Sequence, residues 1–377
     1  MVSKEKVLEY SKQEKMEIIL KAPIETKEDF SLAYTPGIAE VCKVIQENPE
    51  NLNKYTFRKK NLAVISDGSA VLGLGNIGGK ASYPVMEGKC MIFKKFGDIN
   101  AIPIILETQD TEEIINTIKN ISSSFRAINL EDVAAPKCFE IEERLKEILD
   151  IPIMHDDQHG TAIVVLAALI NAIKLTNKDK NVKIVIAGAG AAGYAITKLL
   201  YEHGFRDIIV TDSKGIISKD RKDLNKYKEK LLEITNKDNI RGNLKDAIKG
   251  ADVFIGVSKS NLLTFEDVKT MNSPIVFALA NPIPEIMPEK ALKGGASIVG
   301  TGRSDFKNQI NNALAFPGLF KGVIESGSRK ITEKMKIVTA EAIVEYHKDK
   351  LSKDNLLPSI LDKEVHNFIS EKIKNMK

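Results

Sequence analysis

The chain alternates between short, continuously apolar runs and longer segments in which apolar residues recur every three or four positions. Continuous runs of four to eight residues indicate strands buried on both faces, and the three-to-four spacing indicates amphipathic helices. In the first part of the chain, strands are predicted at 61–68, 99–106, 127–132 and 151–157, with helices at 85–97, 111–125 and 137–149. This alternation predicts a mostly parallel sheet with helices on its faces.

The same pattern organises the remaining residues. Residues 1 to about 30 predict one or two helices broken at Pro23, and the "TPG" segment starts a helix that ends at Pro49. A helix starting near Gly160 leads into a second set of predicted strands, at 182–188, 207–212, 251–258, 274–282 and 296–305. From about residue 330 the chain is again helical and rich in lysine, and we expect this part to pack back on the first domain.

A chain of 377 residues has enough material for two domains. We expect an α/β fold with an N-terminal substrate and metal domain at 1–157, a Rossmann-type doubly wound dinucleotide domain at 158–330, and a C-terminal helical segment at 331–377.

The segment Val182–Asp212 carries a strand, a glycine turn, a helix and a second strand in dinucleotide-binding order. Gly188 allows the tight turn, Gly190 lets the backbone approach a pyrophosphate, and Gly193 lets the helix pack on the strand. The turn also contains Ala191 and Ala192, which we expect at the same phosphates. A lone G-x-G-x-x-G can be a turn of another α/β unit, but the flanking strands and helix favour a nucleotide site.

The second strand ends at Asp212, 24 residues after Gly188, where an acid would hold a ribose 2′-hydroxyl. This acid favours NAD over NADP, although Lys214 is placed to attract a 2′-phosphate. The expected cofactor is therefore NAD or NADP, with NAD favoured.

A second G-x-G-x-x-G lies at Gly73, Gly75 and Gly78. Four residues separate it from the preceding strand, and Pro84 is expected to interrupt the following helix. We interpret these glycines as a close-packed loop that brings backbone near a small ligand, not as a pyrophosphate site.

Two acidic pairs follow predicted strands. Glu131 and Asp132 end one strand, and Asp156 and Asp157 end another. Each pair alone could be a helix cap or a solvated turn, but two pairs at the carboxyl ends of parallel strands would repel without a cation between them. Oxygen ligands suit Mg²⁺ or Mn²⁺. His155 and His159 are expected near this site without binding the metal.

Oxidation of an alcohol also needs a base. Lys89 lies in apolar surroundings, where desolvation and a nearby metal should lower the pKa of its amine. Tyr34, in "AYTPG", is a candidate proton donor. From composition alone, Lys89 could equally be an ordinary surface lysine and Tyr34 an ordinary packing tyrosine.

Charge and cysteine content exclude several classes. The net charge of +4 is spread along the chain without a basic block, which argues against a nucleic-acid partner. Cys42, Cys90 and Cys138 are widely spaced, which indicates a reducing compartment, no structural zinc, and three small core residues. The longest apolar run, at 161–173, is interpreted as too short to span a bilayer. We expect a cytoplasmic protein with no membrane partner.

Seven ordered blocks resemble the malic enzymes, specifically the shorter microbial type. They are "AYTPGIAEVCKVI", "DGSAVLGLGNIGGKASYPVMEGKCMIFKKFGDI", "NLEDVAAPKCFEIEERL", "HDDQHGTA", the Gly188 motif, "LANP" and "NNALAFPG". The similarity runs from about residue 30 to about 330.

The resemblance implies roles for particular residues. It makes Lys89 the general base and Tyr34 the general acid. It makes Glu131, Asp132 and Asp157 the ligands of Mg²⁺ or Mn²⁺.

It also makes Asp156 a support of the base network, together with residues that bind substrate or cofactor. Asn281 and Asn312 would hold the substrate carboxylate, with Asn311 a substitute, and Asn281 would also adjoin the cofactor. Larger relatives carry an arginine where this chain has Ala70, so Ser69, backbone amides and the asparagines must share carboxylate recognition.

The implied activity is oxidative decarboxylation of malate to pyruvate and CO₂ with reduction of NAD(P). A metal-free hydroxy acid or amino acid dehydrogenase would share the nucleotide domain but would not need the acidic cluster. A nucleotide-sensing regulator is a further alternative, although no DNA-reading helix is evident. The family suggests at least a homodimer, and whether the active site is shared between subunits stays open, as do the preferred metal, effectors and physiological direction.

Overall fold

Two parallel sheets form the framework of the computed structural model, which describes residues 3–376. The first sheet has the strand order β2-β1-β3-β4. Its strands are β1 (Asn61–Ser66), β2 (Asn100–Ile105), β3 (Ala127–Leu130) and β4 (Ile153–His155). Pro103 lies in the edge strand β2. Proline cannot donate a ladder hydrogen bond, and an edge strand tolerates it because one of its sides has no neighbouring strand.

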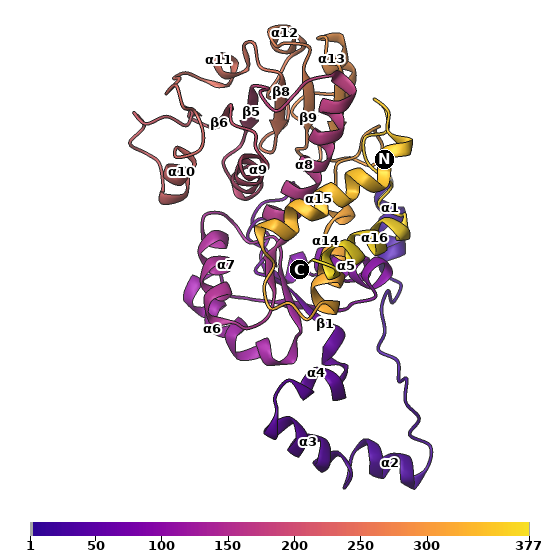
Figure 1. The fold of residues 1–377 in the computed structure, drawn as a ribbon. Helices are drawn as coiled ribbons and strands as arrows, with labels where there is room; N and C mark the ends of the chain where they lie inside the picture. Colours follow the sequence, from indigo (N-terminus) through magenta and orange to yellow (C-terminus); the bar gives the residue numbers. More distant parts are fainter. Residues whose placement is uncertain (1–2, 377) are drawn as a thin grey trace.

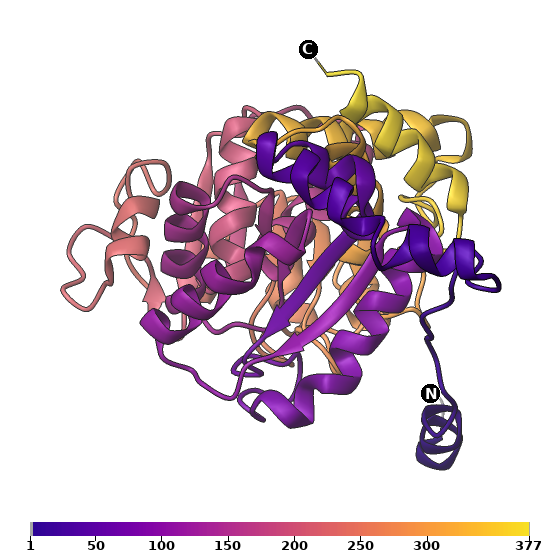
Figure 2. The same ribbon diagram turned by 90° about the horizontal axis from the view of Figure 1, so that it is seen from below.

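Helices pack around this sheet in the purple part of the ribbon in Figures 1 and 2. They are α5 (Gly79–Gly97), α6 (Thr111–Ile121), the short η2 (Ser122–Ser124) and α7 (Lys137–Ile148). Helix α5 continues through Pro84, so the expected interruption is wrong. The proline stands near the start of a 19-residue helix, whose remaining turns keep their own hydrogen bonds and their buried face.

The second sheet has the order β10-β9-β8-β5-β6-β7. Its strands are β5 (Ile184–Ala187), β6 (Ile208–Asp212), β7 (Gly215–Ile216), β8 (Val253–Gly256), β9 (Ile275–Ala278) and β10 (Ile298–Thr301). Five strands are parallel and β7 is antiparallel to β6. This is the doubly wound order, with its switch point between β5 and β8, and it confirms the predicted fold class.

The helices of the second unit are α9 to α13. They are α9 (Ala191–Glu202), α10 (Lys226–Leu231), α11 (Leu244–Ile248), α12 (Phe265–Lys269) and α13 (Pro288–Lys293). Helix α9 begins directly after the glycine turn, as predicted.

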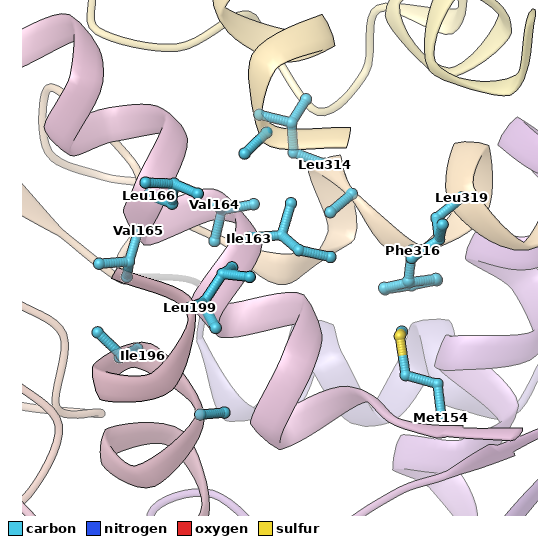
Figure 3. Close-up of a cluster of buried hydrophobic side chains, with 14 of the residues drawn as sticks. Met154, Ile163, Val164, Val165, Leu166, Ile196, Leu199, Leu314, Phe316 and Leu319 are labelled. Atoms are coloured by element: carbon cyan, nitrogen blue, oxygen red, sulfur yellow. The ribbon is translucent and has the colours of Figure 1, made fainter. Parts of the chain in front are cut away.

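Helix α8 (Asp156–Thr176) connects the two sheets. It starts immediately after β4, four residues earlier than predicted, because Asp156 and Asp157 form its first turn. Figure 3 shows Ile163 and Val164 of α8 between side chains of α9 and the segment around Leu314. Helix α8 is long and apolar enough to cross a membrane by length and composition, contrary to our expectation, but 67% of its apolar window is buried inside the protein.

The C-terminal elements return to the first sheet. They are η3 (Asn312–Leu314), α14 (Phe316–Glu325), α15 (Glu333–His347), η4 (Lys348–Lys350) and α16 (Lys363–Lys374). Helix α15 packs along α8, and α16 packs on α14 and α5. The ring of Phe96 in α5 lies 4.8 Å from that of His366 in α16. The exact domain boundaries stay a prediction.

Much of the N-terminal part extends away from this body, although Lys15 pairs with Glu87 of α5 and Met16 packs against the core. Its elements are α1 (Lys4–Ser11), α2 (Lys27–Ala33), α3 (Ile38–Glu47), α4 (Asn51–Tyr55) and η1 (Phe57–Lys60). None of these elements contains a buried residue. Figure 1 shows α2 and α3 well below the sheets, and Figure 2 shows α1 projecting from the body. We call residues 3–56 the N-terminal arm. Its Cys42 is exposed, which corrects the prediction that all three cysteines are core residues; Cys90 and Cys138 are buried.

The glycine turn gives a test of this packing. A Cβ on Gly193 would lie 1.8 Å from the carbonyl oxygen of Gly188, whereas a Cβ on Gly190 would meet nothing within 4 Å. We expect Gly193→Ala to lower the free energy of unfolding by about 1–3 kcal/mol, because the helix must move off the strand. Gly190→Ala is the matched control and should leave it nearly unchanged. Thermal and urea unfolding of both variants measure the difference, and equal stabilities would contradict the packing.

Candidate active site

Lys89 is a buried cation held between two carboxylates. Its side chain, on α5, is 8% exposed. The Nζ atom lies 2.6 Å from Asp156 Oδ2 at the start of α8 and 2.7 Å from Glu131 Oε1 after β3. It also lies 4.2 Å from the ring centroid of Phe316, a cation–π contact. Side chains from α5, α8, α14 and the segment after β3 therefore meet at one ammonium group.

The pKa of Lys89 is raised above its usual value, whereas the sequence-based expectation of a lowered pKa included the charge of a nearby metal. Burial alone lowers it, but the charges of Asp156, Glu131 and Asp157 together outweigh burial. The amine thus stays protonated as long as these carboxylates keep their charge.

Glu131, Asp132 and Asp157 each point one carboxylate oxygen at a common position. These three oxygens all lie within 4.8 Å of one another. Asp132 Oδ2 is buried and has no hydrogen-bond partner in the protein. Three hard oxygen donors with an unpaired acceptor fit Mg²⁺ or Mn²⁺, and among the residues 3–376 this is the single group that meets such spacing.

The electrostatics of this cluster favour a bound cation. Burial, followed by repulsion from Asp157, raises the pKa of Asp132 to about 7. Burial also raises the pKa of Glu131 well above its usual value, and the nearby acids add to this shift. Both shifts express the cost of holding several carboxylates together without a counter-charge.

Neighbouring polar groups hold the three acids in place. Asn129 donates to Glu131 Oε2 at 2.8 Å, and the backbone N–H of Asp132 donates to Asp157 Oδ2 at 2.7 Å. His155 Nε2 lies 3.0 Å from the same Asp157 oxygen. His155 is therefore beside the acidic cluster but outside it, as the sequence predicted.

His159 lies one turn further along α8 and faces away from the cluster. Its Nε2 is 2.9 Å from Glu142 Oε2, and its Nδ1 is 2.9 Å from Nζ of Lys336. The other Glu142 oxygen accepts the backbone N–H of His155 at 2.9 Å. These contacts fix the first turn of α8, on which Asp156 and Asp157 stand.

Asp156 is committed to the amine and not to the acidic cluster. Its Oδ2 accepts hydrogen bonds from Lys89 at 2.6 Å and from Asn312 Nδ2 at 2.7 Å. A Cβ on Gly160 would lie 1.9 Å from Asp156 Oδ1, so only glycine leaves room for this carboxyl group. Asn311 instead caps η3 by accepting the N–H of Ala313 at 2.9 Å.

The loop after β1 closes one side of the site. Ser69 is buried; its hydroxyl donates to Asp67 Oδ1 at 2.6 Å and accepts the N–H of Ala134 at 2.8 Å. Ser69 therefore joins the loop after β1 to the segment after β3. Asp67 also pairs with Lys137 at 2.5 Å.

The second glycine motif shapes this same loop. Gly73, Gly75 and Gly78 all have positive φ values, between 73° and 78°. A Cβ on Gly73 would lie 3.2 Å from the carbonyl oxygen of Asn281, so the loop touches the second unit just after β9. Asn281 is half-buried there and its Nδ2 lies 3.3 Å from the carbonyl oxygen of Leu279.

The dinucleotide motif forms a cradle at the carboxyl end of β5. Gly188 has φ +123°, and Gly190 leaves open space in front of the N-terminus of α9, where Ala191 and Ala192 expose their N–H groups. A phosphate can enter this open space and reach the N–H groups, whereas a side chain at position 190 would obstruct it. Asp212 ends the next strand, β6, as predicted.

Tyr34 is not brought to the other predicted residues. It caps α2 in the N-terminal arm and is 66% exposed, whereas Lys89 is buried in the body. Figures 1 and 2 show α2 and α5 in separate parts of the chain. Within the described residues, Tyr34 therefore does not lie beside Lys89 or the acidic cluster.

Several residues in the site carry no signal of their own in the sequence. Phe316 begins α14, which was not predicted because Pro317 and Gly318 follow it directly. Asn129 and Asp67 lie in or just after predicted strands, where a periodicity argument treats them as ordinary positions. The hydrogen bond of Asn129 to Glu131 and the ion pair of Asp67 with Lys137 are evident only in the folded structure.

Comparison with known proteins matches this architecture over nearly the whole chain. Residues 13–146 match the family model "Malic enzyme, N-terminal domain", and residues 158–375 match "Malic enzyme, NAD binding domain". The chain is 52% identical to the "Bifunctional malic/malolactic enzyme" of Bacillus subtilis, over 94% of this chain and 87% of that protein.

Two further relatives agree. The "NAD-dependent malic enzyme" of Geobacillus stearothermophilus is 51% identical, over 93% of this chain and 74% of that protein. The crystal structure of NAD-dependent malic enzyme from Thermotoga maritima superposes with a TM-score of 0.94 at 46% identity and covers 100% of both chains. The buried lysine, the acidic cluster and the nucleotide cradle thus stand in a chain that belongs to the malic enzyme family.

Proposed function

We propose that this protein converts malate to pyruvate and CO₂ while reducing a nicotinamide dinucleotide, with a divalent metal required. The observation that carries the proposal is the contact between the amine and the metal-type cluster: Lys89 Nζ is 2.7 Å from an oxygen of Glu131. A base in contact with a hard-cation site can act on an alcohol whose oxygen lies between them. A metal-free dehydrogenase would have no use for three converging carboxylates.

The chemistry of the chain's own residues follows from these positions. Lys89, as the free amine, takes the proton of the C2 hydroxyl while hydride leaves C2 for the nicotinamide. Neutralising the charge of Glu131 would lower the pKa of Lys89, because Glu131 is one of the groups that raise it. Asp156 holds the amine of Lys89 in place, and Asn312 holds the carboxyl group of Asp156.

Loss of CO₂ then breaks the bond between C3 and C4 and leaves an enolate. A Mg²⁺ or Mn²⁺ ion held by Glu131, Asp132 and Asp157 would supply Lewis-acid stabilisation of the developing charge. Lys89 returns its proton to the enolate oxygen and removes it again as a tyrosine protonates C3. Tyr34 is our candidate for that tyrosine.

We further propose that the protein is a homodimer in which the arm of one copy supplies Tyr34 to the other. The arm exposes apolar side chains with no partner in its own chain: Ile18 is 92% exposed, Leu20 79% and Leu32 68%. Exposed apolar surface of this kind marks an interaction site. A second copy fits best, because each chain has both an exposed tyrosine in its arm and a site to which that tyrosine is not brought. We place this dimer in the cytoplasm, as the cysteine content suggests.

The base assignment can be tested by substitution. Lys89→Met should lower kcat for malate oxidation by roughly 10²- to 10⁴-fold, the range for loss of a general acid or base. Lys80→Met is the matched control, since Lys80 lies on the same helix with its side chain 88% exposed, and it should keep normal turnover. A stopped assay for NAD(P)H and CO₂ gives the rates. A Lys89 variant with near-normal turnover would remove Lys89 from the mechanism.

The metal assignment has a readout independent of turnover. Mn²⁺ binding, followed by the loss of the free-ion EPR signal, should weaken by roughly 10- to 100-fold or more in Asp157→Asn. Asp349→Asn changes an exposed aspartate of η4 and should bind Mn²⁺ normally. Treatment with EDTA should stop malate oxidation in the unaltered protein. Unchanged Mn²⁺ affinity in Asp157→Asn would contradict the assignment.

The exchange of arms predicts complementation between two inactive variants. Tyr34→Phe and Lys89→Met should each be inactive alone, because each removes one group from every site. Co-expressed with different tags in one cell, they should regain about a quarter of normal activity, since mixed dimers form half of a random population and hold one intact site of two. If Tyr34 served its own chain, every site would carry one defect and no activity would return.

A further inference from the structure

Glu285 is a buried carboxylate that holds two loops of the nucleotide domain together. It lies between β9 and α13 and is 0% exposed. Its Oε1 accepts the backbone N–H of Ser258, after β8, at 3.1 Å. Its Oε2 accepts the backbone N–H of Ala280, after β9, at 3.0 Å. Each oxygen of this one side chain therefore serves a different loop.

The end of β8 leaves room for this carboxyl group. A Cβ on Gly256, the last residue of β8, would lie 2.3 Å from Glu285 Cδ. Burial raises the pKa of Glu285, and hydrogen bonds from backbone N–H groups, first those of Ala280 and Ser258, oppose that shift. A buried carboxylate costs more free energy than an apolar side chain in the same space. Its role is therefore to be sought in the two loops that it joins.

The loop after β8 borders the phosphate cradle, and the loop after β9 carries Asn281. A Cβ on Gly188, in the glycine turn, would lie 3.2 Å from Ser258 Cβ, so the two segments are packed together. Ala280 directly precedes Asn281. A dinucleotide crosses a doubly wound sheet at its switch point, here between β5 and β8, which brings its nicotinamide half to β8 and β9. Glu285 thus lies beneath the place expected for the nicotinamide.

Further contacts connect this place to the acidic cluster. A Cβ on Gly73 would lie 3.2 Å from the carbonyl oxygen of Asn281. In the same loop, the backbone N–H of Ala70 donates to the carbonyl oxygen of Asp132 at 2.9 Å. A shift of the loop after β9 would therefore change the position of Asn281 relative to the groups that act on the substrate.

We propose that Glu285 is a positioning residue for hydride transfer, which fixes the loops after β8 and β9 relative to each other and so sets where the nicotinamide meets Asn281. The inference rests on the proposed function and adds to it a residue that acts through two loops. Glutamine has the same shape, but its amide nitrogen cannot accept a hydrogen bond. In Glu285→Gln, one backbone N–H would face another donor, and its loop would move away.

Two readouts should change in Glu285→Gln. The kcat/KM for malate should fall by roughly 10- to 100-fold, because a displacement of about 1 Å at a reacting centre can cost that much. The fluorescence of bound reduced coenzyme should shift toward that of the free coenzyme, because the nicotinamide is held less firmly.

Two other readouts should stay constant if the role is positioning. The Kd of ADP-ribose, which lacks the nicotinamide, and the Kd of Mn²⁺ should each stay within about twofold, well below the effect of one lost hydrogen bond. Glu289→Gln is the matched control, since Glu289 is an exposed acid in the first turn of α13, and it should leave all four readouts unchanged.

The outcomes separate this inference from the proposed function. Weaker binding of ADP-ribose and Mn²⁺ together with lower turnover would overturn it in favour of a general loss of structure. Unchanged kcat/KM and fluorescence would overturn it as well. Should Glu285→Gln fail to fold, Glu285→Asp keeps both oxygens on a shorter side chain and should give the same pattern. An unaltered protein that binds ADP-ribose without oxidising malate would overturn the proposed function, and this inference with it.

Discussion

The buried ammonium of Lys89 is the interaction on which the arrangement of the site depends. It joins α5 to the end of β3 through Glu131 and to the start of α8 through Asp156. Removing one partner from such a group leaves an uncompensated buried charge, which is costly. The same turn of α8 that carries Asp156 continues as the helix between the two sheets, so the amine also ties the acidic cluster to the framework of the nucleotide domain.

The sequence determines most of this framework because burial leaves a readable pattern. Strands β1, β3 and β5 are buried at every position, which is why continuous apolar runs located them. The glycine turn before α9 was equally clear, since packing against Gly188 permits no side chain at Gly193. The two acidic pairs were found because strands of a parallel sheet end at one edge, and the resemblance to the malic enzymes selected Glu131, Asp132 and Asp157 from them.

Contacts between distant segments could not be read in this way. The pattern gave Lys89 an apolar environment but not its two carboxylate partners, whose charges outweigh burial and raise the pKa of its amine. Asp212 was recognised by its place at the end of a strand. Its ion-pair partners Arg221 and Lys228 were not, because they come from a loop and a short helix with no periodic signal. Pro84 shows the opposite error, since a local rule was applied where the rest of the helix overrides it.

Four carboxylates surround the site, and hydrogen bonding divides them between two tasks. Asp156 is bound by Lys89 and Asn312 on one oxygen and lies outside the group of three acids that could hold a metal. Asp157, its neighbour in sequence, is turned to the other side by His155 and the backbone N–H of Asp132. Adjacent positions at the start of a helix point about 100° apart, so one turn can serve both the amine and the cation. Asp156 therefore serves the amine and Asp157 the cation site, and the two side chains cannot exchange these roles without moving α8.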